Sequence, residues 1–271
     1  MLKNAIDMHI HTAPDLVKRS VTDIEAARMA ANAGMRAVMY KNHLSPTYAR
    51  AAVAQEAEPR LRVFGSLVLN EQIGGINPSA VATACAMGAK CIWMPTTSAE
   101  NHIAYYKSSA KPVRLFGDAG KPVAGLMAIL EMIAKSDIIL ATGHISPEEI
   151  SALLPLARQA GVKKFVVTHP EHEVVDVPRD MQKKLAAGGA FFERCFFATN
   201  SSQKLPVESV ADDIRAVGWE TTVLSTDFGQ ETNEVPVRGI ATFLRELARC
   251  GIPENNLKTM ITDHPAYLLG L

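Results

Sequence analysis

The sequence predicts a single-domain α/β protein with the (β/α)8 architecture of a TIM barrel, and three observations support this prediction. Short apolar runs alternate with longer stretches of helical periodicity, and eight such pairs fit within 271 residues. Strands separated by helices pair in parallel, and eight parallel strand–helix units occupy about 250 residues in a closed barrel. The first strand is followed by no Gly-x-Gly-x-x-Gly turn, which argues against an open, doubly wound sheet.

The expected strands are short apolar runs at residues 5–11, 36–41, 61–69, 90–94, 137–142, 164–168, 190–195 and 221–226. Helical patterns follow them at residues 22–33, 46–57, 78–87, 123–135, from 146 onward, 178–187, 206–217 and 236–250. A terminal helix at about 253–262 follows the eighth unit. Because no linker or change in composition divides residues 1–271, we expect one domain.

Capping residues mark several of the expected helix starts. Thr22 is followed three residues later by Glu25, which is the pattern of a capping box. Ser146 and Glu149 repeat this pattern before the fifth helix. Ser45 is expected to cap the second helix, with a proline at its first position.

Residues 95–121, after the fourth strand, form a long segment without clear periodicity and with two Lys-Pro signals and a Gly-Asp-Ala-Gly stretch. A loop of this length in a compact domain is often an active-site cover. We therefore expect this segment to be irregular and to lie over the functional end of the barrel.

Charge and aromatic content exclude several classes of partner. Lys plus Arg and Asp plus Glu both number 28, so the formal net charge is zero, and the chain has no basic run. Aromatic residues make up only 6% of the chain, which disfavours platforms for stacking bases. We therefore expect a small-molecule substrate rather than nucleic acid or a charged membrane surface.

The four cysteines are scattered, and none forms a Cys-x-x-Cys pair, so the sequence offers no thiolate zinc knuckle or redox motif. No apolar run approaches the ~20 residues needed to span a bilayer. The first residues do not have the order of a secretory signal. These features predict a cytoplasmic protein, and base rates alone suggest a homo-oligomer.

Histidines gather at the ends of the expected strands. Asp7, His9 and His11 alternate along the first strand and are expected to share one of its faces. His144, His169 and Asp227 follow the fifth, sixth and eighth strands. Active sites of such barrels lie at the C-terminal ends of the strands, so we expect these side chains to meet there. Imidazole and carboxylate ligands suit Zn2+, with Mn2+, Fe2+ or Ni2+ as alternatives.

Three further residues are candidates for binding a substrate. Lys41 ends an apolar strand, and a buried lysine needs an anionic partner, although its side chain could instead extend to the surface. Arg19, in the first loop, could clamp a carboxylate or phosphate, although a solvated loop arginine is the alternative. His43 lies in the loop after Lys41. Glu193, on the seventh strand, could point inward and orient a metal ligand or Lys41, or it could instead pair with the surroundings of Arg194.

This set resembles the amidohydrolase superfamily, whose pattern is His-x-His on strand one, one His after each of strands five and six, and Asp after strand eight. The matching positions here are His9, His11, His144, His169 and Asp227. Residues 263–271 are also similar to the Asn-Pro-Ala-x-x-Leu-Gly ending common in those enzymes. The resemblance covers essentially the whole chain and implies a metal-dependent hydrolase acting on a small amide, lactone or ester.

Strand four departs from the pattern of the family's binuclear members, which place a bridging carboxylated lysine or a glutamate there. Residues 91–96 read Cys-Ile-Trp-Met-Pro-Thr and contain neither. The resemblance therefore implies one metal ion per chain rather than two. Lys41, if it were carboxylated, would be an unusual bridge.

In the implied mechanism, a metal-activated water attacks the substrate and Asp227 accepts its proton. His169 is then either a further ligand or a group that stabilises the oxyanion. One alternative is a metal-dependent decarboxylase, because related lyases use a similar ligand set and Arg19 and Lys41 could bind a carboxylate. Another is a phosphoester hydrolase, whose opening Asp-x-His-x-His-Thr is present but whose later His-x-His is absent. A metal-binding barrel without turnover is the non-enzymatic alternative.

Overall fold

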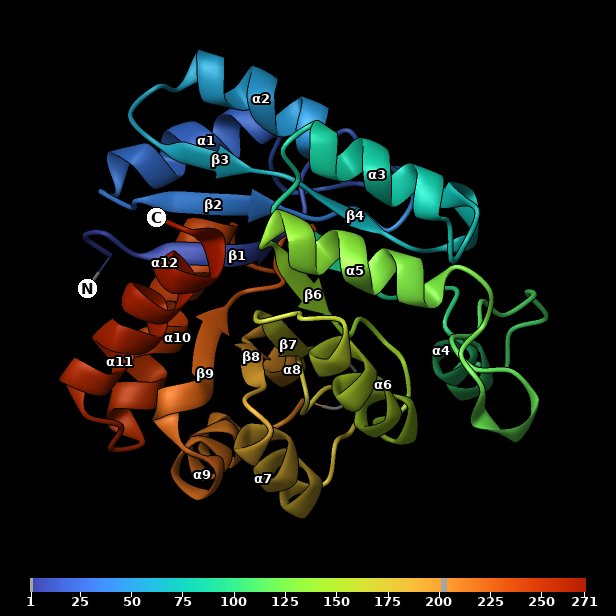
Figure 1. The fold of residues 1–271 in the computed structure, drawn as a ribbon. Helices are drawn as coiled ribbons and strands as arrows, with labels where there is room; N and C mark the ends of the chain where they lie inside the picture. Colours follow the sequence, from blue (N-terminus) through green and yellow to red (C-terminus); the bar gives the residue numbers. More distant parts are fainter. Residues whose placement is uncertain (1, 201–203) are drawn as a thin grey trace.

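The apolar runs form nine short strands in the computed structural model, which describes residues 2–200 and 204–271 (Figure 1). The strands are β1 (Ile6–Ile10), β2 (Ala37–Tyr40), β3 (Arg62–Phe64), β4 (Ser66–Val68), β5 (Cys91–Trp93), β6 (Ile139–Ala141), β7 (Phe165–Thr168), β8 (Phe191–Cys195) and β9 (Thr222–Ser225). They form two sheets in the orders β1-β2-β3 and β4-β5-β6-β7-β8-β9, and every neighbouring pair is parallel, as predicted.

The strands β3 and β4 are one predicted strand that is interrupted at Gly65, and this residue joins the two sheets. The carbonyl of Gly65 accepts a hydrogen bond from Lys90 N at 2.9 Å. A Cβ at this position would lie 2.3 Å from Tyr48 Cα, so only glycine lets the second helix begin this close to the strand.

The two sheets also meet at a second junction, the seam between β9 and β1, which closes the barrel. Asp227 N donates to His9 O at 2.8 Å, and His11 N donates to Phe228 O at 2.7 Å. The parallel strands therefore form one ring, in agreement with the predicted (β/α)8 barrel, and the seam itself carries histidines and an aspartate of the predicted site.

Helices surround this ring of strands (Figure 1). They are α1 (Asp23–Asn32), α2 (Tyr48–Ala57), α3 (Pro78–Ala86), α4 (Glu100–Tyr105), α5 (Leu126–Ser136), α6 (Pro147–Gln159), α7 (Arg179–Ala187), α8 (Phe197–Asn200), α9 (Val207–Val217), α10 (Pro236–Arg249), α11 (Glu254–Ile261) and α12 (Asp263–Leu269). Short 3-10 turns occur at Glu71–Ile73, Asp118–Gly120 and Trp219–Thr221. The capping boxes at Thr22 and Ser146 are both present, as predicted.

The predicted cap of the second helix is wrong. Ser45 lies in a turn whose amides at Leu44 and Ser45 donate to the Asn42 side chain, and the helix starts three residues later at Tyr48. The N-cap position belongs to Thr47, whose hydroxyl bonds instead to the β2 and β4 backbones. Tertiary bonds have therefore replaced the local cap.

The segment expected to be irregular, residues 95–121, contains the short helix α4. Its N-cap, Ala99, makes no side-chain capping bond, so the sequence lacks the usual signal for its start. The helix lies well to one side of the barrel in Figure 1, within the long connection that leads to α5. The tail after α11 likewise forms a helix, α12, which was expected only as a short tail.

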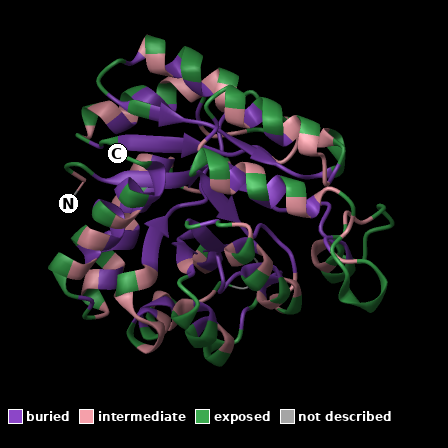
Figure 2. Ribbon diagram, viewed as in Figure 1, coloured by how far each residue is buried: buried purple, intermediate pink, exposed green. Residues whose placement is uncertain are grey.

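Buried residues fill the strands and the inner faces of the helices (Figure 2). Two apolar clusters lie between strands and helices, and a third lines the barrel interior with side chains such as Met8, Met39 and Trp93. Ala266, Leu268 and Leu269 of α12 pack against this third cluster.

The first strand contains a bulge that corrects one prediction from the sequence. Asp7 pairs with Val38 and Ile10 with Tyr40, so two residues of β1, Met8 and His9, lie opposite one residue of β2, Met39. His9 consequently points into the barrel, whereas Asp7 lines a small cavity with Ile10 and Val38 in the layer next to α1. Asp7 and His9 therefore do not share a face, because a bulge redirects the side chains after it.

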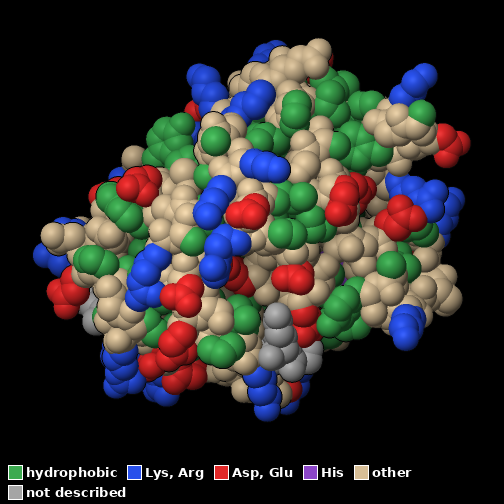
Figure 3. Space-filling view, turned by 90° about the horizontal axis from the view of Figure 1, so that it is seen from below, with side chains coloured by type: hydrophobic (Ala, Val, Ile, Leu, Met, Phe, Trp, Pro, Cys, Tyr) green, Lys and Arg blue, Asp and Glu red, His purple; other side chains and the backbone are tan. Residues whose placement is uncertain are grey.

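Charged side chains of both signs are interspersed over the face shown in Figure 3. Among the helices of residues 2–200 and 204–271, none is long and apolar enough to cross a bilayer.

Candidate metal centre

Two histidines of the first strand and the aspartate after β9 meet at the C-terminal end of the barrel. His9 Nε2 and His11 Nε2 each lie 3.0 Å from Asp227 Oδ1. All three side chains are buried, and their potential ligand atoms lie within 4.8 Å of one another. The structure thus brings together the predicted residues from the first and last strands.

Backbone geometry at the end of β9 makes this approach possible. Asp227 has a left-handed backbone with φ 55°, which a non-glycine residue adopts at a cost in energy. Two residues later, a Cβ at Gly229 would lie 1.9 Å from His11 O, so only glycine fits there. The turn therefore holds Asp227 close to the end of the strand that carries both histidines.

The Asp227 carboxylate is ionised despite its burial. Burial alone would raise the pKa of Asp227, but the imidazoles of His9 and His11 hold that pKa well below its usual range. Burial lowers the pKa of His11 to about 4, so this ring is neutral at pH 7. Burial also favours the neutral form of His9, but the carboxylates of Asp227 and Glu193 outweigh it and raise the pKa.

Glu193 lies behind His9, on the inner face of β8. Its Oε2 is 3.0 Å from His9 Nδ1, and its Oε1 accepts a hydrogen bond from Ser225 Oγ at 3.0 Å. A carboxylate that accepts the Nδ1 proton leaves His9 Nε2 to face Asp227. Cys195 Sγ lies 3.7 Å from the same Nδ1, a contact that the sequence did not predict.

Lys41 points into the site rather than to the surface. Its Nζ lies 3.0 Å from His9 Nε2 and 4.4 Å from the centre of the Trp93 ring, and the side chain is fully buried. Burial lowers the pKa of Lys41, against the opposing charges of Asp227 and Glu193. Of the two alternatives from the sequence, the structure therefore favours a buried lysine over one whose side chain extends to the surface.

The other two predicted ligands lie beside this group rather than within it. The His169 ring centre is 6.0 Å from that of His9 and 4.9 Å from that of His144. His169 Nδ1 is buried and has no hydrogen-bond partner among the described residues. His144 Nδ1 lies 2.8 Å from Nδ1 of His102 on α4.

The remaining histidines and Arg19 border the same region. His43 stacks on His11 with ring centres 5.0 Å apart, and its Nδ1 lies 2.8 Å from Thr96 Oγ1. Arg19 Nη2 lies 3.4 Å from His11 Nδ1 and also pairs with Asp15. His102, one of the loop histidines expected beyond the strand ends, reaches this region from α4, although nothing in residues 95–121 predicts which part of that segment turns inward.

These residues fit a divalent transition metal ion. His9, His11 and Asp227 supply two imidazole nitrogens and a carboxylate oxygen that converge on one point, the donor set that such ions prefer. The unpartnered Nδ1 of His169 is a further donor nearby. Lys41 Nζ lies in the same space, so the ammonium group must turn aside or lose its proton when a cation binds His9 Nε2.

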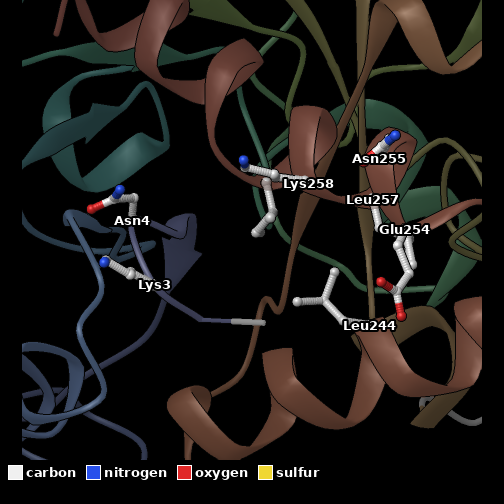
Figure 4. Close-up of a pocket in the computed structure, with 8 residues that line it drawn as sticks. Lys3, Asn4, Leu244, Glu254, Asn255, Leu257 and Lys258 are labelled. Atoms are coloured by element: carbon white, nitrogen blue, oxygen red, sulfur yellow. The ribbon is translucent and has the colours of Figure 1, made fainter.

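Figure 4 shows a surface pocket of about 500 Å³ whose lining includes none of these histidines. It is formed by Lys3 and Asn4, just before β1, together with residues of α10 and α11. The pocket lies at the N-terminal end of the strands. In barrels of this kind that end contributes to stability rather than to catalysis. Its side chains include no histidine, and we assign it no role in the chemistry.

Buried neutral imidazoles are expected to make the metal-free fold sensitive to acid. The unfolded chain takes up protons near pH 6.5, whereas folded His11 stays neutral down to about pH 4. The free energy of unfolding therefore falls as the pH drops from 6.5 to 4, by roughly 3 kcal/mol for His11 alone. Burial also lowers the pKa values of His43, His144 and His169 well below their usual range. These three histidines therefore change the free energy of unfolding in the same direction as His11.

Asp7 acts in the opposite direction, because burial raises its pKa to about 7 and its contribution to stability decreases as the pH rises from 4 to 7. His9, whose pKa is also raised, acts in the same direction as Asp7. The four histidines with lowered pKa values outnumber these two groups, so we expect the net slope to follow the four. Urea unfolding of chelator-treated protein between pH 7.5 and 4.5 measures the net slope, and His43→Asn should make it shallower. A free energy of unfolding that rises toward pH 4.5 would contradict the prediction.

Comparison with known proteins gives a family and a fold. A model of a family of unknown function, DUF6282, matches residues 4–193. No curated protein matches the chain.

Several solved structures are similar over nearly the whole chain. An amidohydrolase from Pseudomonas aeruginosa is 11% identical with a TM-score of 0.65, covering 98% of this chain and 95% of that one. A 2,6-dihydroxybenzoate decarboxylase is 11% identical with a TM-score of 0.60, covering 100% of both chains. An organophosphorus hydrolase from Deinococcus radiodurans is 12% identical with a TM-score of 0.59, covering 98% and 92%. At these identities the likeness shows a common fold and confirms the predicted barrel.

Proposed function

Because the chain belongs to the DUF6282 family and has the fold of the amidohydrolase superfamily, we propose that it is a metal-dependent hydrolase acting on a small amide, lactone or ester. The observation that supports this most directly is the convergence of His9, His11 and Asp227 at the C-terminal end of the barrel. That end is where enzymes of this architecture place their chemistry.

A divalent cation held by His9, His11 and Asp227 would supply a nucleophilic hydroxide at neutral pH, since such ions lower the pKa of bound water to about 7. Asp227 is ionised and is the residue we assign to take the proton of the attacking water and return it to the leaving group. His169 acts beside it, as a further ligand or as a donor to the developing oxyanion.

The chain's own residues also prepare this centre. Glu193 orients His9 through Nδ1, which directs Nε2 toward Asp227. Lys41, Arg19 and His43 form the wall against which the substrate would bind, and the two cations suit a substrate that carries an anionic group.

A metal-dependent decarboxylase is the second candidate, and one observation favours it. Lys41 Nζ lies 3.0 Å from His9 Nε2 on β1, and Arg19 Nη2 lies 3.4 Å from Nδ1 of His11, just after that strand. Two cations next to a metal centre could hold a substrate carboxylate in place for cleavage. Release of carbon dioxide rather than an acid and an amine or alcohol separates this candidate from the hydrolase.

The finer assignments follow from the same residues. We propose Zn2+ as the favoured ion and one ion per chain rather than two, because the group of close donors that contains Asp227 consists, among the described residues, of His9, His11 and Asp227. From the sequence we also propose a small-molecule substrate, a cytoplasmic location and a homo-oligomer. We propose no nucleic acid and no membrane as partners.

The proposal is tested by elemental analysis of protein purified without added metal. We expect about one transition metal ion per chain, and its loss in the double variant His9→Ala, His11→Ala. His264→Ala is the matched control, because this histidine lies on α12 and its Nδ1 bonds to Thr222 O at 2.7 Å, away from the centre. Full metal content in the double variant would overturn the ligand assignment.

The loaded protein is then screened against amides, lactones and esters, aromatic carboxylates, and aryl phosphates. Turnover in the first group supports the hydrolase, and carbon dioxide from the second supports the lyase. Phosphate release would replace both with a phosphoester hydrolase, and a metal-loaded protein inactive on all three would favour the non-enzymatic barrel.

A further inference from the structure

Asp7 is a buried carboxylate that the proposed chemistry does not use, although it lies next to the histidines in sequence. Its side chain is 1% exposed and lies on the outer side of β1, in the layer between the barrel and the helices. It therefore cannot reach a substrate at the C-terminal end of the barrel.

The hydrogen bonds of Asp7 join the two strands that form the closing seam. Oδ1 accepts from His9 N at 3.2 Å, within the bulge of β1. The same oxygen accepts from Thr226 N at 3.1 Å, and Oδ2 accepts from Thr226 Oγ1 at 2.7 Å. One carboxylate thus holds the backbone of His9 and the residue immediately before Asp227.

Thr226 extends this connection to the backbone around it. Its Oγ1 accepts from Phe228 N at 3.2 Å and lies 3.4 Å from His9 O. The hydroxyl therefore fixes both sides of the left-handed turn at Asp227, whose φ of 55° requires support from its surroundings. The bulge at His9 and the turn at Asp227 are the two irregular points of the seam, and Asp7 and Thr226 bond to both.

We propose that Asp7, together with Thr226, is a positioning clamp that sets the spacing between His9 and Asp227 from behind the centre. The inference rests on the proposed function, because the spacing matters for the metal centre proposed there. A bulge that redirects a side chain at an active site is a recurrent device, and here the clamp ties that bulge to the second ligand strand. Supporting partners of metal ligands typically affect metal affinity or activity by about 10- to 100-fold.

The clamp is tested with three variants and a matched control. Asp7→Leu removes all three acceptor contacts at similar size, whereas Asp7→Asn keeps Oδ1 for the two backbone amides. Thr226→Val removes only the hydroxyl. Thr222→Val is the control, because this buried hydroxyl lies on the same strand but bonds to Gly218 O at 2.9 Å, at the opposite end of the barrel.

The dissociation constant for Zn2+, measured by competition with a chromophoric chelator, is the first readout. We expect it to rise by about 10- to 100-fold in Asp7→Leu and less in Thr226→Val. Asp7→Asn should stay within about threefold of the parent and Thr222→Val should be unchanged, even where their melting temperatures fall equally. A dissociation constant that follows melting temperature across all four variants would make Asp7 merely structural and overturn the proposal.

Amide hydrogen exchange of the metal-free protein is the second readout and needs neither metal nor substrate. The amides of Asp227 and His11 form the seam bonds, and we expect both to lose protection selectively in Asp7→Leu, with recovery in Asp7→Asn. If the parent bound no metal, the proposed function would fail, but this readout would still decide the clamp. Unchanged seam protection in folded Asp7→Leu would overturn it.

Discussion

Replacing Asp227 by asparagine is expected to lower kcat by about 10³-fold while the barrel remains folded. Asparagine keeps the shape of the side chain but not the charge that lies 3.0 Å from both His9 Nε2 and His11 Nε2. The variant loses both the anionic ligand and the group assigned to accept the proton of water. Mutating a residue that only supports a metal ligand lowers metal affinity by about 10- to 100-fold. Because Asp227 is itself assigned as a ligand, we expect a larger loss in Asp227→Asn.

The Asp227→Asn prediction has a check that is independent of any substrate. The charge of Asp227 is the largest influence that raises the pKa of His9, so that pKa should drop in the metal-free variant and can be followed by NMR of the ring. Asp263→Asn, on α12, is the control and should change neither the metal affinity nor the pKa of His9. An Asp227→Asn protein with full metal content and full turnover would remove Asp227 from the centre.

The strands of the barrel were predictable because each is apolar, short and separated from the next by a helical pattern. The capping boxes at Thr22 and Ser146 were predictable for a similar reason, since they depend on residues three positions apart. Ser45 failed as a cap because Thr47, bonded to β2 and β4, belongs to tertiary structure that a local pattern does not contain. Helix α4 was missed because its first residues carry no capping signal.

The candidate site was predictable to the extent that strand ends determine it. His9, His11 and Asp227 converge because the barrel closes between the first and last strands, and that follows from counting eight units. The bulge that separates Asp7 from His9 was not predictable, because alternation along a strand assumes a regular register. The sequence offered Glu193 as a group that orients a metal ligand or Lys41, but it could not single out His9 as the contact, because one extra residue in a strand reverses which side chains face inward.

Lys41 offers the second test with a large expected effect, because it decides what the buried cation does. Lys41→Met keeps the packing over Trp93 and removes the charge 3.0 Å from His9 Nε2. For an anionic substrate we expect KM to rise by about 10- to 100-fold, because the variant loses a charge-assisted hydrogen bond to the substrate. The metal content should not change. The pKa of His9 in the metal-free protein should rise, since the charge of Lys41 lowers it.

Two control variants make the Lys41 result specific. Lys41→Arg keeps a positive charge and should recover part of the lost affinity for substrate. Lys164→Met removes another buried lysine, which pairs with Asp137 at 2.9 Å, and should leave KM unchanged. If Lys41→Met instead lost its metal, Lys41 would be a ligand, which for a lysine in this environment means a carboxylated side chain. The centre would then hold two ions bridged from the second strand, and the substrate anion would depend on Arg19 alone.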